Sequence, residues 1–287
     1  MRQITTWLAS SICLIGLSSC GAPDGSADIL SSTPDTIPNA PDMAAAQSSV
    51  TSRFDFNVIA LAKSAALSDR FVDSYRLLIA EADGMLSQPL ASVINKTHPA
   101  ASGDLHDYMS LAPYWWPNPN TEDGYPYIQR DGQRNPDADD SSLCDTKERR
   151  RMERSVSVLT QAYLLTDDNR YAMKAAAFLR AWFIAPDTRM NPNLNFAQSI
   201  PGKHKGACYG IIDTRFLPLT LDYAALLEAS GAWTEQDTAA LKSWFRDYLN
   251  WLLTSPLGIE ESETLNNHGT WYDVQVVAIL LHLGETD

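Results

Sequence analysis

The sequence predicts a mostly helical domain, and three observations support this fold class. From residue 54 onward, apolar residues recur at three- and four-residue intervals wherever a regular pattern exists. No run of alternating β-branched residues bounded by hairpin turns occurs. Successive helical segments of about 15 to 20 residues are joined by short connections, as antiparallel helix pairs, bundles and toroids require. The period alone does not choose among these three arrangements.

The N-terminal residues are predicted to be a targeting signal. An apolar run follows Arg2 and is too short to span a bilayer, so residues 1–19 are interpreted as a signal peptide. Its end, Leu-Ser-Ser-Cys, resembles the lipobox of bacterial lipoproteins, which predicts cleavage before Cys20 and lipidation of its thiol. Gly21 after the cysteine favours the outer membrane, so we expect a lipid-anchored periplasmic protein. An ordinary signal peptide that contains Cys20 is the alternative.

A flexible tether is expected between this anchor and the folded domain. Residues 20–52 are rich in Pro, Ser, Asp and Ala and have no apolar period. The domain therefore comprises residues 53–287.

Helix signals then follow in order along the domain. The expected helices are 54–66, 68–86, one that begins at a capping box of Asp145 and Glu148, one capped by Asp168, one within 212–229, and one opened by Thr234 opposite Asp237. Two long segments, 87–142 and 186–210, lack this period and are dense in Pro, Asn, Gly, Asp and aromatic residues. Segments of that length inside a compact domain are usually functional loops.

The adjacent indoles Trp115 and Trp116 lie in the first of these loops. Neighbouring side chains on an extended chain point in opposite directions. We therefore expect one of the two rings to pack in the core and the other to be free to face a ligand.

The sharpest local pattern is Asn266–Asp273, which directly precedes an apolar run. A helix that begins near Asn267 would place polar and aromatic groups on one stripe and apolar groups on the neighbouring, core-facing stripe. The first stripe is His268, Trp271, Tyr272 and Gln275, and the second is Val274, Val277, Ala278 and Leu281. Because a helix N-terminus disfavours an imidazolium, His268 is expected to be neutral and able to accept a proton. A capping Asn followed by a structural histidine is the alternative.

Composition limits the function. The 287 residues are 45% apolar, enough for a sizeable core, and the 22 Lys and Arg against 35 Asp and Glu give a net charge of −13. This charge argues against nucleic acid as a partner. An anionic ligand must instead meet a local basic cleft. The densest basic run, Lys147, Arg149, Arg150, Arg151 and Arg154, is either a solvated helix face or the rim of such a cleft.

Two cysteines remain in the predicted domain, and no metal site is expected. A disulfide between Cys144 and Cys208 and two free thiols are both compatible with an extracytosolic compartment. The chain has no CxxC or HxxxH motif, and its five histidines are scattered.

Several segments taken together resemble the alginate lyase superfamily, which are polysaccharide lyases with an α/α toroid. The segments are Asp107–Pro119, Tyr125–Gly132, Asn195–Gly202, Gly210–Arg215 and the helix start at Asn267-His268. The resemblance covers roughly residues 55 to 287 and implies an all-α toroid of antiparallel helix pairs with long functional loops. It also implies β-elimination on a mannuronate, guluronate or glucuronate polymer, with no cofactor or metal. The expected partners are an anionic polysaccharide and, through the lipid anchor, a membrane.

The resemblance also implies residue roles. Asn267 would neutralise the substrate carboxylate, and His268 would be a neutraliser or the base. The substrate-binding residues would be Tyr108, Tyr114, Trp115, Trp116, Arg130, Gln198, Arg215, Trp271 and Tyr272. Core packing is the alternative for Tyr272, and an ion pair with Asp213 is the alternative for Arg215.

Relatives in this superfamily continue beyond the Asn-His helix and take a catalytic Tyr, with an Arg nearby, from a later helix. Here the chain stops at Asp287, where that helix is expected to end. We therefore expect an incomplete toroid from a truncated gene product.

Two other function classes remain open. A hydrolase on a similar toroid would need two carboxylates that flank the scissile bond, with Asp107, Asp131 and Asp213 as candidates. A non-catalytic glycan-binding lipoprotein is the third class.

Overall fold

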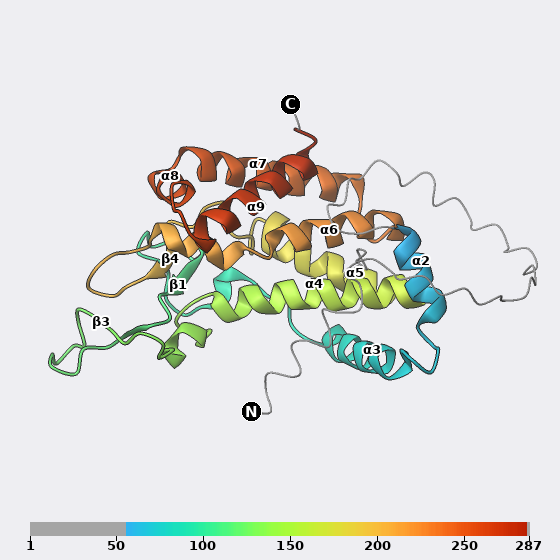
Figure 1. Cartoon of the computed structure of the whole chain (residues 1–287), viewed down its shortest axis with the longest axis horizontal. Coiled ribbons are helices and arrows are strands. Elements are labelled where there is room, and N and C mark those ends of the chain that lie inside the picture. The colour runs from blue at the N-terminus through green and yellow to red at the C-terminus, as the bar shows by residue number, and fades with distance from the viewer. Residues whose placement is uncertain (1–55, 286–287) are drawn as a thin grey trace, which may run out of the picture.

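The computed structural model describes residues 56–285, and they confirm the helical prediction (Figure 1). The α-helices are α2 (Phe56–Ala65), α3 (Val72–Leu86), α4 (Thr146–Thr166), α5 (Asn169–Leu179), α6 (Leu217–Leu227), α7 (Glu235–Thr254), α8 (Pro256–Ser262) and α9 (Asn267–Leu283). The 3₁₀ segments are η2 (Val93–Asn95), η3 (Pro136–Asp139), η5 (Cys208–Thr214) and η6 (Glu228–Ser230), and a π-helical turn, η4 (Arg180–Ile184), extends α5. The predicted signal peptide, lipobox and tether lie outside the described residues.

The structure confirms the predicted caps of two helices. A third helix begins at the predicted residue but without the predicted capping hydrogen bond. Thr234 and Asp237 form the capping box of α7, and the Asp168 side chain caps α5. Helix α4 begins where expected, but the Asp145 carboxylate makes no capping hydrogen bond. It accepts a hydrogen bond from the Met109 backbone N–H at 2.8 Å and pairs with the Lys96 ammonium at 3.0 Å. A tertiary contact has therefore replaced the local one.

Four short strands tie the two long loops together. Strand β1 (Met109–Leu111) pairs in parallel with β4 (Phe196–Ser199), and β2 (Trp115–Trp116) pairs antiparallel with β3 (Ile128–Gln129). The first pair joins the loops predicted at 87–142 and 186–210, so both lie at one end of the helices (Figure 1).

The core-facing side of α9 is the reverse of the predicted one. Tyr272 and Gln275 are buried together with Ile279 and Leu283, whereas Val277 is 54% exposed. Gln275 is accommodated because its amide is fully hydrogen-bonded: the oxygen accepts from the Thr214 hydroxyl at 2.7 Å, and the nitrogen donates to two backbone carbonyls. A buried polar group is tolerated when its partners are supplied in this way.

The two cysteines of the domain do not form a disulfide. Cys144 and Cys208 are buried and free, so the structure has two thiols rather than the disulfide.

Within residues 56–285, no helix is long and apolar enough to cross a membrane.

Candidate active site

The predicted site residues gather at the end of the helical domain where β1, β4, α8 and the first turn of α9 lie (Figure 1). Segment η5 links them, since it packs against β4, α8 and α9. The N-termini of α4 and α9 point to this end, and α2 lies at the other end of α4.

His268 is held by a carboxylate that the sequence did not reveal. Its Nδ1 lies 2.9 Å from Glu261 Oε1 in α8, and the Glu261 side chain is 1% exposed against 26% for His268. Burial raises the pKa of Glu261, and the His268 imidazole opposes that rise. When Glu261 is ionised it can only accept a hydrogen bond, so a neutral His268 would carry its proton on Nδ1 and leave Nε2 as the nitrogen that can accept a proton.

The local backbone fixes this pair. The Asn266 side chain caps α9 and accepts from the His268 backbone N–H at 2.7 Å. Gly269 allows close approach, because a Cβ there would lie 2.2 Å from the Thr264 carbonyl oxygen. The end of α8 and the start of α9 are thereby locked together, and the side chain of Asn267 is exposed beside His268.

Cys208 borders the same pair and is unsuited to be a nucleophile. Burial, together with Glu260 and Glu261, raises the pKa of its thiol to about 12. A thiol in that state carries almost no thiolate near neutral pH.

A second cluster is organised around Asp213 in η5. Its carboxylate accepts hydrogen bonds from Tyr108 at 3.1 Å, Ser110 at 2.6 Å and the Gln198 amide at 3.1 Å. Gln198 has a positive φ of 48°, and the Ser110 hydroxyl accepts from its backbone N–H at 2.7 Å. A non-glycine residue in this region persists only when its surroundings hold it. The cluster therefore fixes the Gln198 amide by its nitrogen and leaves its oxygen available.

Tyr108 was predicted to be a stacking wall, and the structure contradicts this. The residue is fully buried, and its hydroxyl also accepts from Arg149 Nε at 3.3 Å. Burial and the Asp213 carboxylate raise the pKa of Tyr108 well above its usual value. Tyr108 therefore holds the Asp213 carboxylate through its hydroxyl, and its buried ring cannot stack on a ligand.

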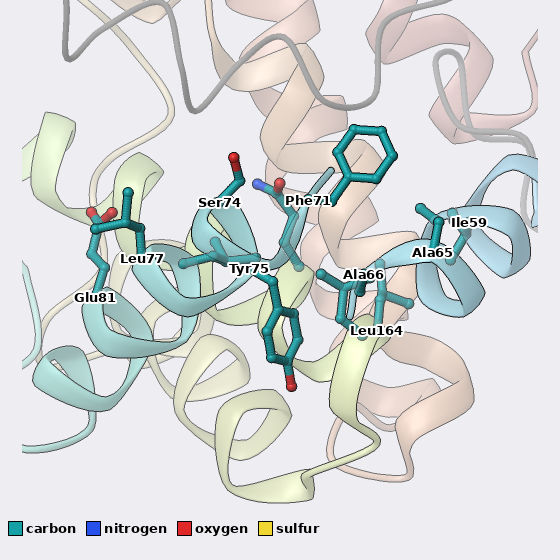
Figure 2. Close-up of a pocket in the computed structure, with 13 residues that line it drawn as sticks. Ile59, Ala65, Ala66, Phe71, Ser74, Tyr75, Leu77, Glu81 and Leu164 are labelled. Atoms are coloured by element: carbon teal, nitrogen blue, oxygen red, sulfur yellow. The ribbon is translucent and has the colours of Figure 1, made fainter. Parts of the chain in front are cut away.

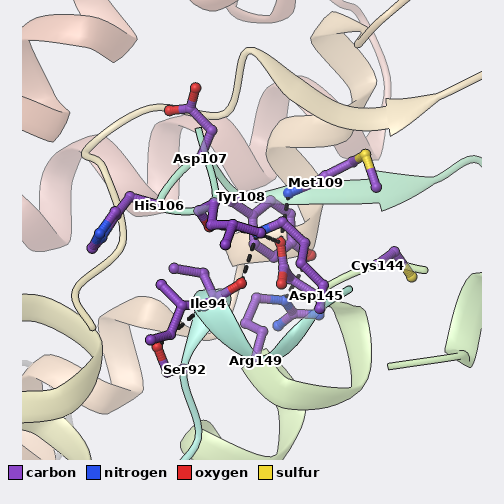
Figure 3. A network of polar contacts seen from close by, with 12 residues as sticks. Ser92, Ile94, His106, Asp107, Tyr108, Met109, Cys144, Asp145 and Arg149 are labelled. Atoms are coloured by element: carbon purple, nitrogen blue, oxygen red, sulfur yellow. Dashed lines mark hydrogen bonds and ion pairs between the residues drawn. The ribbon is translucent and has the colours of Figure 1, made fainter. Parts of the chain in front are cut away.

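Figure 3 shows how Tyr108 is anchored. Lys96 and Asp145 form an ion pair in which both side chains are fully buried, and Lys96 also donates to the carbonyls of Val93 and Leu105. Burial raises the pKa of Asp145 to about 7, against the opposing effect of Lys96. The pair ties the chain on either side of Tyr108 to the start of α4.

The predicted basic run on α4 is in part the solvated helix face that was expected, because Lys147, Arg150 and Arg154 are exposed, but its arginines are all paired with acids. Arg149 is buried and bonded to both oxygens of Glu153 at 2.6 and 2.7 Å. The other three arginines of the run pair with acids as well: Arg150 with Asp139, Arg151 with Glu148, and Arg154 with Glu81. These guanidiniums are therefore already neutralised by the protein itself.

Arg215 is different, because no carboxylate of the described residues forms an ion pair with it. Its guanidinium donates to the Ile212 carbonyl at 3.0 Å and lies 4.6 Å from the centroid of the Phe216 ring. Burial and the neighbouring Arg149 lower the pKa of Arg215. The alternative of an ion pair with Asp213 is not realised, so this cation remains available for an acidic ligand.

The aromatic residues divide into three groups. Tyr272 is 5% exposed and donates to the Leu252 carbonyl at 3.0 Å, so its alternative role in core packing is the one observed. Trp271 packs edge-on against Phe216, with 6.4 Å between the ring centroids. Tyr114 is 44% exposed on the β2–β3 ribbon.

Trp115 and Trp116 each make a cation–π contact with a side chain of the protein. Lys203 lies 4.5 Å from the Trp115 ring centroid, and Arg130 lies 5.1 Å from that of Trp116. Neither indole is a core residue, which corrects the expectation that one of the two would be buried.

The carboxylates proposed for a hydrolase are each engaged locally. Asp107 accepts from Asn191 and Asn193, Asp131 from the Gly132 backbone N–H, and Asp213 from the cluster described above. No group of three or more His, Cys, Asp or Glu residues within the described part of the chain is arranged to hold a metal ion.

The best-defined apolar cavity lies elsewhere, between α2, α3 and α4 (Figure 2). It has a volume of ≈ 170 Å³ and is lined by Ile59, Phe71, Tyr75 and Leu164 among others. Leu164 is 15 residues beyond Arg149 on α4, a separation of about 22 Å at the helical rise. Its lining is mostly apolar and its one charged side chain is the acid Glu81, which does not suit a polyanion.

The protein is all-α and toroid-like, because antiparallel helix pairs make up the domain. A polar site with an unpaired cation lies at one end of these helices. The family model described as Alginate lyase matches residues 92–287, and the chain therefore belongs to the alginate lyase family.

A solved structure of an alginate lyase from Bacteroides ovatus is similar to the chain, with 40% sequence identity and a TM-score of 0.79. The similarity covers 83% of this chain and 63% of that lyase, so the chain spans less than two thirds of the length of that protein. No curated protein matches the chain.

Proposed function

We propose that the chain acts as a polysaccharide lyase that cleaves alginate or a related polyuronate by β-elimination. The observation that carries this proposal is the buried Glu261, whose Oε1 lies 2.9 Å from Nδ1 of His268 in the first turn of α9. Asn267, the residue before His268, is exposed beside it. A histidine that is held by a carboxylate at Nδ1 can accept a proton at Nε2 and is a suitable general base.

The reaction begins with the substrate carboxylate. The C5 proton becomes acidic only when the negative charge on the adjacent carboxylate is offset. Asn267 and the unpaired Arg215 are donors of the required kind. A single donor in this role is typically worth on the order of 10² to 10³ in rate.

Proton transfer then completes the elimination. His268 Nε2 takes the C5 proton, the electron pair of the C5–H bond forms the C4–C5 double bond, and the C4–O4 bond breaks. The departing O4 takes a proton from a general acid, for which a tyrosine is a suitable residue type. In this proposal Gln198 accepts a hydrogen bond from a sugar hydroxyl at Oε1, while its Nε2 donates to Asp213.

The proposal extends to location. The resemblance of residues 17–20 to a lipobox supports a lipid-anchored protein in the periplasm, attached to the outer membrane through Cys20. Labelling with a radioactive fatty acid tests this: Cys20→Ala should abolish incorporation, and unchanged labelling would contradict the anchor.

The activity is tested by following ultraviolet absorbance on polymannuronate, polyguluronate and glucuronan. The conjugated double bond should appear with the wild-type protein and be absent with His268→Ala, while the helical circular dichroism stays intact. The matched control is His98→Ala, because His98 is exposed and its Nδ1 contacts only Thr97. New reducing ends without absorbance would indicate a hydrolase, and tight binding without any product would indicate a glycan-binding protein.

A further inference from the structure

The loop after β4 presents two exposed lysines, Lys203 and Lys205, in a chain with a net charge of −13. No acidic residue within the described part of the chain forms an ion pair with either of them. Unlike the arginines of α4, these cations are therefore not neutralised by the protein.

The backbone under Lys203 is fixed in place. The Tyr127 backbone N–H donates to the Pro201 carbonyl at 3.0 Å, and Ile200 bridges to His204. Gly202 has a φ of 78°, and a Cβ at this position would lie 2.7 Å from the Pro126 Cα atom. The loop is thus packed directly against the ribbon that carries Trp115.

The Lys203 side chain has a defined position as well. Its ammonium lies 4.5 Å from the centroid of the Trp115 ring, a distance typical of a cation–π contact. Such a contact orients the ammonium without neutralising its charge, because the ring is a quadrupole and carries no net charge. Lys203 therefore remains a full cation in a fixed place.

The backbone that carries Trp115 is linked by hydrogen bonds to the strand that carries Gln198 of the Asp213 cluster. The Ala112 backbone N–H donates to the Ser199 carbonyl at 3.0 Å, and Trp115 N–H donates to Ala112, so Trp115 is tied to the residue after Gln198. Lys203 is five positions after Gln198, and a chain of that length spans at most about 17 Å. Arg130 does not share this position, since Trp116 points to the opposite face of the ribbon.

We propose that Lys203, held on Trp115, is an accessory subsite that binds the carboxylate of a uronate residue flanking the one that is cleaved. The inference rests on the proposed function, because it assumes a polyuronate substrate. It adds a residue that sets the preference for a continuously charged polymer. A neutral sugar at the flanking position would leave the ammonium without a partner.

Binding to polymannuronate oligomers, measured by isothermal titration calorimetry, tests the proposal without relying on turnover. His268→Ala serves as the parent, so that the oligomers stay intact. Lys203→Gln should weaken binding about fivefold, the size expected for one partly exposed charge pair, and should reduce the salt dependence of the dissociation constant. Lys203→Arg should stay within about twofold of the parent, since it keeps the charge and the ring contact.

Lys174→Gln is the matched control. Its ammonium lies 5.5 Å from the Phe178 ring on α5, so the substitution removes a similar contact away from the proposed site. This variant should bind as the parent does.

The role of the ring is tested by a double-mutant cycle. In a Trp115→Leu background, Lys203→Gln should weaken binding by less than it does in the presence of Trp115, because the ammonium is no longer held in place.

Two outcomes separate this inference from the function on which it rests. If the parent binds the oligomers and Lys203→Gln binds equally well, the accessory subsite is wrong while the proposed function stands. If the parent binds no polyuronate at all, the proposed function fails, and this inference fails with it. With carboxyl-reduced oligomers, Lys203→Gln should have no effect, and a loss there would overturn the assignment to a carboxylate.

Discussion

The buried carboxylate behind His268 makes a quantitative prediction. Glu261→Gln keeps the size of the side chain and a hydrogen bond to Nδ1, and it removes only the charge. If His268 is the base, it becomes an imidazolium in the transition state, and Glu261 stabilises that cation. The variant should therefore lose rate while it keeps its fold.

The magnitude follows from burial. Glu261 is almost completely inaccessible, with 1% of its side chain exposed, so the charge pair is poorly screened. Two unit charges about 4 Å apart interact by about 4 kcal/mol at an effective dielectric constant of about 20, against about 1 kcal/mol in water. A loss of about 4 kcal/mol from the transition state corresponds to about a 10³-fold decrease in kcat.

The assay is the initial rate of ultraviolet absorbance on saturating polyuronate, with circular dichroism to verify folding. Glu263→Gln is the control, because Glu263 is an exposed carboxylate directly after α8, and the hydrogen bond of His268 goes to Glu261. It should retain the wild-type rate within about twofold. A folded Glu261→Gln protein whose kcat falls less than about fivefold would refute the base assignment, since that is the size expected of a solvent-screened pair.

Three further predictions concern stability, measured by urea unfolding. Lys96→Met should lower the free energy of unfolding by about 3 to 5 kcal/mol because it leaves Asp145 buried and unpaired, and the double variant Lys96→Met/Asp145→Leu should be less destabilised than this single one. Burial lowers the pKa of His282 to about 4, so the unfolded chain binds a proton at this residue at a higher pH than the folded protein does. The free energy of unfolding should therefore fall by up to about 3 kcal/mol from pH 7 to pH 4. The His282→Phe variant should show a flatter pH profile of stability, and a profile parallel to that of the wild type would contradict this prediction. Tyr272→Phe should cost about 1 kcal/mol through the lost bond to Leu252 and leave polyuronate binding unchanged, whereas weaker binding would return Tyr272 to the substrate site.

The helices were predictable because their signals are local. The capping box of Thr234 and Asp237 and the cap at Asp168 need only residues two or three positions away, and both occur as predicted. Asp145 shows where this logic fails. It has the residue type of a cap, but a carboxylate that can pair with a buried lysine gains more from that contact than from a capping bond.

The prediction of which side of α9 faces the core failed for a related reason. Hydrophobicity favoured Val277 for the core and Gln275 for the surface, and the structure has them the other way round. Gln275 is buried because Thr214 and two backbone carbonyls supply its hydrogen bonds, and those groups come from η5 and from its own helix. Periodicity in one segment contains no information about partners in another.

The site was predictable in part. His268 and Gln198 lie where local sequence motifs drew attention to them, and their structural partners Glu261 and Asp213 do not stand out. Glu261 is one of three carboxylates in residues 260–263, and nothing in that run distinguishes the buried one from its exposed neighbours. Only the packing of α8 against α9 selects it.

Charge gives the strongest argument from the whole molecule. The run of arginines on α4 is the densest basic segment of an acidic protein, yet Arg149, Arg150, Arg151 and Arg154 are each paired with an acid in the fold. A paired guanidinium contributes little to the attraction of a polyanion, because its partner cancels its field at distances beyond the pair. The cations that matter for an acidic polymer are those without a carboxylate, and among the described residues at this end of the domain they include Arg215, near the start of α6, and Lys203 on the loop after β4. We therefore expect the salt dependence of polyuronate binding to depend on these isolated cations and to be insensitive to Arg150→Gln or Arg154→Gln. A loss of salt dependence in either α4 variant would show that the ion pairs open when the polymer binds.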